Sequence, residues 1–132
     1  MNSLFKYVLP LLFAISLAAC DSSAPNFEGT YGLPNPGGKP TPIVRVIKRD
    51  GKFFLSSAHK SGWTAEKEAQ TVSADQYKKI FRTDMPSSVS GISSKDFAIF
   101  KCPDSYSIGK STFTSGYFLA FILGISEVIK ID

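Results

Sequence analysis

The chain has 132 residues, of which 43% are hydrophobic, and it carries a formal charge of +4. This length suits one domain and leaves no room for a second hydrophobic core. The basic residues are spread along the chain, which argues against nucleic-acid binding. Beyond residue 20 the chain offers one cysteine and one histidine, too few for a zinc site of three or four such ligands.

The N-terminal segment has the layout of an export signal. Lys6 supplies a positive charge, residues 7–18 are apolar, and Leu17-Ala18-Ala19-Cys20 places small side chains beside a cleavage site. On this motif, residues 1–20 resemble the precursors of bacterial lipoproteins.

The resemblance implies a lipid anchor. Residues 1–19 would be removed as a signal peptide, and the Cys20 sulfur would carry a diacylglyceryl group, usually with a further acyl chain on the new amino terminus. Two or three acyl chains together make dissociation from a membrane negligible. An uncleaved transmembrane anchor is the alternative, but Pro10 interrupts the apolar run, which is shorter than the roughly 20 residues of a spanning helix.

Residues 20–26 form the predicted lipidated tether, since their small and polar residues follow no apolar period. Asp21 resembles the signal that retains enterobacterial lipoproteins in the inner membrane. We therefore favour the inner over the outer membrane, with the domain facing the periplasm. Removal of residues 1–19 leaves 113 residues with a formal charge of +3, and residues 27–132 are predicted to form a single β-rich domain.

The predicted domain begins with a strand, a loop and a hairpin. Aromatic, polar and small residues alternate over residues 27–32, as in a strand. Four prolines and a Gly-Gly pair make residues 33–42 an exposed loop. The hairpin covers residues 41–58, because Asp50-Gly51 is a favoured two-residue type I′ turn.

The turn also fixes the register of this hairpin. Val46 is predicted to face Leu55, and Ile47 to face Phe54. One face, which should be core, carries Val44, Val46, Phe53 and Leu55. The reverse face, with Ile47 and Phe54, is amphipathic and is either partly covered or available to a partner.

Residues 63–82 contain a predicted strand followed by a helix. Apolar residues from Trp63 to Val72 favour a strand over residues 63–72, although the charged residues 66–68 also allow a helix. Ser73 and Gln76 match a capping box, and apolar residues follow at helical spacing. One short helix is therefore predicted over residues 73–82.

The remaining strands are predicted in the C-terminal part. Residues 83–95 are a long loop that allows one brief strand, and residues 97–102 alternate as a central strand with two apolar faces. Residues 106–114 continue the β character. Residues 116–125 form the most apolar segment, predicted as a buried strand that turns near Gly124 into a final strand. Seven to eight short strands with one helix predict a mainly β fold, a small antiparallel barrel or sandwich.

No group of side chains predicts catalysis. His59 is the only histidine that could serve as the base of nucleophilic hydrolysis, and no Gly-x-Ser-x-Gly nucleophile elbow occurs, so a catalytic triad is not expected. With Cys20 lipidated, Cys102 is the remaining thiol, and no internal disulfide can form. Cys102 alternates with Ala98 and Phe100, which predicts a buried, unreactive side chain, the alternatives being a reactive thiol or an intermolecular bridge. We expect no enzymatic activity, cofactor or metal.

His59, Lys60 and Trp63 are the candidate contacts for a partner. An aromatic residue with cationic neighbours offers a large contact area at a small entropic cost. The alternative is that Trp63 plugs one end of the β core.

Three classes of function remain open. The first is a lipid-anchored protein that binds a protein partner, as an inhibitor or immunity protein against an envelope-directed toxin or hydrolase. The second is a calycin-like barrel that holds a small apolar ligand or lipid, lined by residues 113–121. The third is a structural accessory of an envelope complex. Cavity size separates the first two, because a barrel of about eight strands is either filled by its own side chains or holds one small ligand.

Overall fold

A computed structural model of the chain describes residues 26–132. The predicted leader over residues 1–19, the lipidation site Cys20 and the sorting residue Asp21 lie outside the described residues. In chain order the elements are β1 (Gly29–Leu33), β2 (Thr41–Arg49), β3 (Lys52–His59), β4 (Gly62–Trp63), β5 (Lys67–Thr71), α2 (Ala74–Phe81), β6 (Ser90–Ser93), β7 (Phe97–Lys101), β8 (Tyr106–Ile108), β9 (Ser111–Phe113), β10 (Tyr117–Phe121), β11 (Gly124–Glu127) and β12 (Ile129–Lys130).

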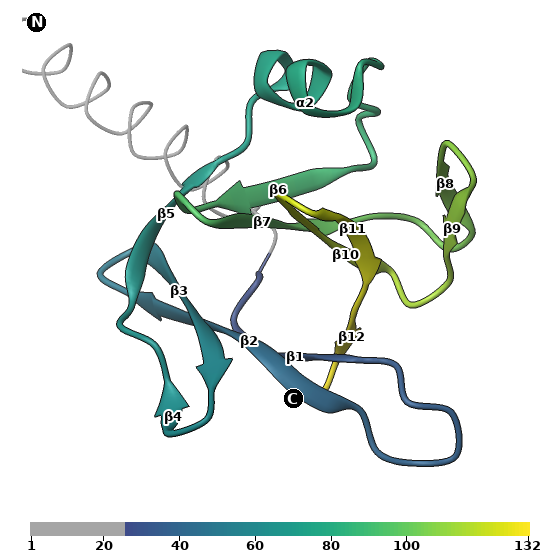
Figure 1. Cartoon of the computed structure of the whole chain (residues 1–132). Helices are drawn as coiled ribbons and strands as arrows, with labels where there is room; N and C mark the ends of the chain where they lie inside the picture. Colours follow the sequence, from purple (N-terminus) through teal and green to yellow (C-terminus); the bar gives the residue numbers. More distant parts are fainter. Residues whose placement is uncertain (1–25) are drawn as a thin grey trace, which may run out of the picture.

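The sheet bends round into an antiparallel barrel. Its strands follow the order β11-β10-β7-β6-β5-β3-β2-β1-β12. β11 and β12 are separated only by Val128, and the first pairs with β10 while the second pairs with β1. The last stretch of chain therefore joins the two ends of the sheet (Figure 1), and with β11 and β12 taken as one interrupted strand the wall has eight. This confirms the predicted mainly β fold and favours the barrel over the sandwich.

The β2–β3 hairpin has the predicted turn and register. Asp50 and Gly51 have φ values of 52° and 76°, as a type I′ turn requires. Val46 pairs with Leu55 and Ile47 with Phe54. The core face is confirmed as well, because Val44, Val46 and Leu55 are buried and Phe53 packs against them.

The interior of the barrel is filled with side chains. Tyr31, Leu55, Ile99 and Val128 come from four parts of the wall and are at most 1% exposed. The Tyr31 hydroxyl donates to the Phe27 carbonyl oxygen at 2.6 Å, which satisfies a polar group that would otherwise be costly to bury. The middle of the barrel is thus a packed core.

A second core covers the outer face of β6, β7 and β10. Helix α2 and the β8–β9 hairpin lie against this part of the wall (Figure 1). The ring of Phe118 stacks on Phe100 and Phe113, with centroids 4.9 and 4.7 Å apart. Because Phe113 and Phe118 belong to this outer core, the prediction that residues 113–121 as a whole line the barrel interior is wrong. Within β10, only the alternate residues from Tyr117 to Phe121 point inward.

Helix α2 begins and ends as its sequence predicts. The Ser73 side chain accepts from the Gln76 amide at 3.2 Å, and the Gln76 side chain accepts from the Ser73 amide at 2.9 Å. Arg82 ends the helix in a left-handed conformation, with φ 57°. Tyr77 is fully buried and its hydroxyl hydrogen-bonds that of Tyr106 on β8, so the helix is held to the β8–β9 hairpin.

Three sequence predictions are refined by long-range pairing. Residues 63–72 divide into β4 and β5, and residues 83–95 contain β6, which pairs with both β5 and β7. Residues 106–114 form a separate hairpin.

Residues 116–125 do form a strand and turn, but Ile122 and Leu123 are exposed, so this segment is not buried throughout. Within residues 26–132, no helix has the length and apolar character needed to cross a bilayer.

Candidate functional site

The most exposed large apolar side chains of the described residues lie at the end of the β10–β11 hairpin. Phe121 and Gly124 form its last pair, so Ile122 and Leu123 are the whole turn. Ile122 is 97% exposed and Leu123 is 87% exposed. These two residues are called the tip below.

The chemistry of turns does not account for the tip. Two-residue hairpin turns favour residues that tolerate positive φ, as Asp50 and Gly51 do in the same barrel. Ile122 is β-branched and neither tip residue has a positive φ. A sequence that breaks a local preference without adding stability is expected mainly at functional sites.

A hollow of about 410 Å³ opens at the barrel mouth next to the tip. Below the hollow the barrel is closed by the packed core, so the hollow is a shallow pocket and not a channel through the barrel. Its apolar lining is formed by Leu33, Ile43, Val44, Phe97, Leu119 and Phe121. We call this space the mouth hollow.

The polar groups that line the mouth hollow already have partners within the chain. The Ser57 hydroxyl hydrogen-bonds Thr64 Oγ1 at 3.2 Å. Asp96 accepts from Lys67 Nζ at 2.6 Å, and the Ser126 hydroxyl donates to a main-chain carbonyl oxygen at 3.3 Å. The hollow therefore offers an apolar surface with little demand for a polar ligand.

The other side of the tip faces helix α2. Phe121 and Ile122 line a further hollow of about 410 Å³ with Ile80 and Lys95. Ile80 is half exposed. The tip thus stands between two hollows, which share Asp96, Phe97 and Phe121 in their linings.

Positive charge flanks this surface. The loops 34–40, 60–61, 94–96 and 122–123 follow the strand ends that line the mouth hollow, and of their charged side chains Asp96 is paired with Lys67. Neither Lys60 nor Lys95 lies within 4.0 Å of a carboxylate of the described residues. Both lysine side chains are exposed, so they are available to negative charges on a partner.

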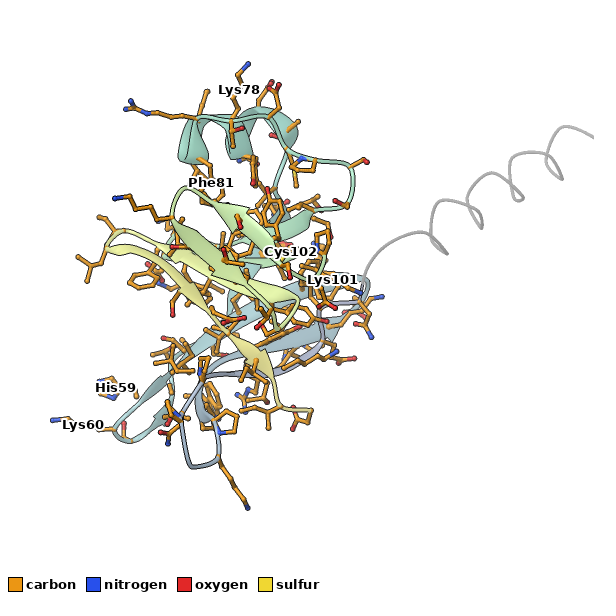
Figure 2. All side chains as sticks on the ribbon, turned by 90° about the vertical axis from the view of Figure 1, so that its right-hand side faces the viewer. His59, Lys60, Lys78, Phe81, Lys101 and Cys102 are labelled. Atoms are coloured by element: carbon orange, nitrogen blue, oxygen red, sulfur yellow. The ribbon has the colours of Figure 1, made fainter. Side chains whose placement is uncertain are left out.

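The three residues predicted as partner contacts do not form one cluster. His59 and Lys60 point away from the barrel at the β3–β4 turn (Figure 2). Trp63 pairs with Ala58, is half-buried, and stacks under Arg45, whose guanidinium carbon lies 4.8 Å from the ring centroid. Trp63 belongs to neither core, so the prediction that it plugs the β core is wrong.

The β3–β4 turn nevertheless lies on the mouth side. Ala58, next to His59, lines the mouth hollow together with Phe121, next to the tip. In Figure 2 the yellow β10–β11 hairpin points to the same side as His59 and Lys60. Sequence reasoning therefore found one edge of the surface and missed its centre, although the run Phe121-Ile122-Leu123-Gly124 carried the signal of a turn.

Comparison with protein-family models, with characterised proteins and with solved structures found no match to this chain.

The described residues contain no group of three or more His, Cys, Asp or Glu side chains placed to hold a metal ion. His59 contacts only the Ser61 hydroxyl, at 3.4 Å. The site that the structure assembles is thus a surface of apolar side chains and lysines.

Cys102 is expected to resist thiol reagents in the folded protein. Its side chain is buried next to Phe100 in the outer core. Burial, followed by the charges of Glu127 and Asp104, raises the pKa of the thiol to about 11, so the reactive thiolate is scarce at neutral pH. A disulfide reagent at pH 8 should label one thiol per chain only after denaturation. Rapid labelling of the native protein would contradict the buried position.

Proposed function

We propose that this protein is a non-enzymatic, lipid-anchored envelope protein whose barrel mouth binds a protein partner, as an inhibitor or immunity protein against an envelope-directed toxin or hydrolase. The exposed tip, Ile122 and Leu123, carries the proposal. Contiguous exposed apolar surface rimmed by polar residues is typical of sites of protein association.

The shape of the mouth supports an inhibitor in particular. Active sites are concave, and the binding pockets of proteins are lined mostly by apolar and aromatic side chains. The tip is a narrow protrusion that ends in two large apolar side chains, with hollows on both sides. Such a protrusion can enter a cleft and exclude water from it, which is how a few central residues come to dominate binding.

The position of the first described residues supports a partner that approaches from the periplasm. Phe27 packs edge-on against Phe53, with ring centroids 6.0 Å apart, and Glu28 accepts from the Lys48 amide at 3.4 Å. These contacts lie near the Asp50-Gly51 turn, at the end of the barrel opposite the mouth. A lipid on Cys20 would hold that end towards the bilayer, and the mouth would face away from it.

The test is capture followed by inhibition. The affinity-tagged full chain, expressed in its own host, should retain one protein in stoichiometric amount, and this protein should lose toxic or hydrolytic activity when bound. The double variant Ile122→Ser/Leu123→Ser should lose both effects. As a control, Ile131→Ser removes a half-exposed apolar side chain just after β12, where the Ile131 amide donates to the Thr30 carbonyl oxygen of β1, and this variant should retain both effects. Equal capture by the tip variant would contradict the proposal.

A small apolar ligand is the second candidate, and the mouth hollow is the observation in its favour. About 410 Å³ is at the small end of the range for ligand sites. The packed interior core stops the hollow from extending through the barrel. Organic extraction of the purified protein should therefore leave the covalent lipid on the protein and recover no stoichiometric free lipid, whereas recovery of a bound free lipid would favour the carrier.

The lipid anchor predicts a defined N-terminal peptide. Mass spectrometry of the mature protein should find a peptide that begins at Cys20 and carries two or three acyl chains, and Cys20→Ser should abolish this product. Asp21→Ser should move the protein from the inner-membrane to the outer-membrane fraction in a density gradient. A wild-type peptide that begins at Met1 would refute the anchor.

A further inference from the structure

The mouth hollow and the unpaired lysines beside it identify the chemistry of the partner. Resting on the function proposed above, we infer that the partner inserts one aromatic or long aliphatic side chain into the mouth hollow, from a surface that is acidic around that side chain. The tip would then enter the partner, while the partner's side chain would enter the mouth hollow.

The lining selects an uncharged side chain. Six large apolar residues surround the space, and its three polar side chains are engaged by Thr64, Lys67 and a main-chain carbonyl. A polar group entering the hollow would lose its water without finding a free partner, which is unfavourable. An aromatic side chain gains most, because it buries about 150–250 Å² in such a site.

The depth of the hollow selects a side chain over a free lipid. Leu55 and Ile99 beneath the mouth are at most 1% exposed and close the barrel interior. A free acyl chain that extended beyond the hollow would remain in water along much of its length. A side chain carried on a partner's surface needs only the depth that the hollow provides.

The lysines select an acidic surface around the inserted side chain. Lys60 and Lys95 lie in two different loops at the mouth and have no carboxylate within 4.0 Å among the described residues. The acidic residue in those loops, Asp96, is neutralised by Lys67. A second copy of this chain would bring its own lysines to the same place, so charge complementarity disfavours a homodimer and favours an acidic partner.

Short peptides test the inference without the natural partner. The lipidated full chain is placed in lipid nanodiscs, since detergent could occupy the hollow, and titrated with fluorescein-labelled Glu-Glu-Phe-Glu-Glu. Two matched peptides replace Phe by Ala or each Glu by Lys. The acidic Phe peptide should bind at least ~10-fold more tightly than either control, and its affinity should fall as salt is added.

Charge reversal provides the matched variants. Lys60→Glu/Lys95→Glu should weaken the acidic Phe peptide by ~10-fold or more. Lys101→Glu/Lys110→Glu reverses two lysines away from the mouth and should change the affinity by less than ~2-fold. In Figure 2 Lys101 lies on the side opposite Lys60.

Several results would overturn the inference. They are no saturable binding of the acidic Phe peptide up to ~5 mM, equal binding of the Ala or Lys peptide, and equal effects of the two lysine pairs. Strong binding of the neutral dye N-phenylnaphthylamine without any binding of the acidic Phe peptide would also overturn it, and would assign the hollow to a small apolar ligand. If these results occur while partner capture still depends on the tip, the proposed function stands and only the acidic partner is excluded.

Discussion

Replacing Phe118 by Ala is expected to lower the free energy of unfolding by about 3–5 kcal/mol. Phe118 is fully buried, and its ring is stacked between the rings of Phe100 and Phe113. The ring centroids of Phe81 and Tyr106 lie 5.9 and 6.0 Å from the centroid of the Phe118 ring. Truncation would leave a cavity where α2, the β8–β9 hairpin and the barrel wall meet. A single domain is stabilised by only about 5–15 kcal/mol, so this loss is a large part of the total.

The control for this prediction is the same substitution at Phe54. Phe54 is half-buried on the outer face of β3, where Arg49 stacks on its ring at 4.6 Å. Truncation of the Phe54 side chain leaves no enclosed cavity and should lower the free energy of unfolding by roughly 1 kcal/mol or less. Urea denaturation of both variants measures the difference. A Phe118→Ala variant as stable as Phe54→Ala would show that the outer core contributes little to folding.

The elements predicted most accurately from the sequence are those fixed by neighbouring residues. Asp50-Gly51 encodes its own turn, and a turn of known length fixes the register of both strands beside it. Ser73 and Gln76 satisfy two amides at the start of α2 within four residues of chain. Alternation alone placed the two apolar faces of β7.

The elements predicted least clearly depend on contacts between distant residues. The sequence of residues 83–95 predicts a loop that allows one brief strand, whereas β6 pairs with both β5 and β7 and lies in the middle of the wall. Gly91 in β6 lies beneath the Phe100 ring, which occupies the space that a Cβ would need. This close approach cannot be seen in the local pattern, where a glycine among serines suggests a loop.

The candidate site was missed for a similar reason. Hydrophobicity predicted that the whole of residues 116–125 is buried, because apolar residues usually lie inside. The position of a turn depends on which residues pair across the hairpin, and here Phe121 pairs with Gly124. The two apolar residues between them are therefore exposed, and the proposed binding surface rests on this exposure.

Replacing the tip by Asn-Gly, as Ile122→Asn/Leu123→Gly, is expected to weaken partner binding by roughly 100-fold or more, since residues at the centre of an interface commonly contribute 2 kcal/mol or more each. The same change should alter the free energy of unfolding by less than ~1 kcal/mol. Ile122 and Leu123 are too exposed to contribute to either core, and neither has the positive φ that would make Asn-Gly the favoured pair at this turn.

A large loss of binding with little change in stability would distinguish a functional tip from a structural one. Titration calorimetry with the captured partner gives the first quantity, and urea denaturation gives the second. If Asn-Gly instead lowered the free energy of unfolding by more than ~1 kcal/mol, the apolar pair would have a structural role. In that case the two exposed apolar residues would be explained by stability alone, and the main argument for the mouth as the binding surface would fail.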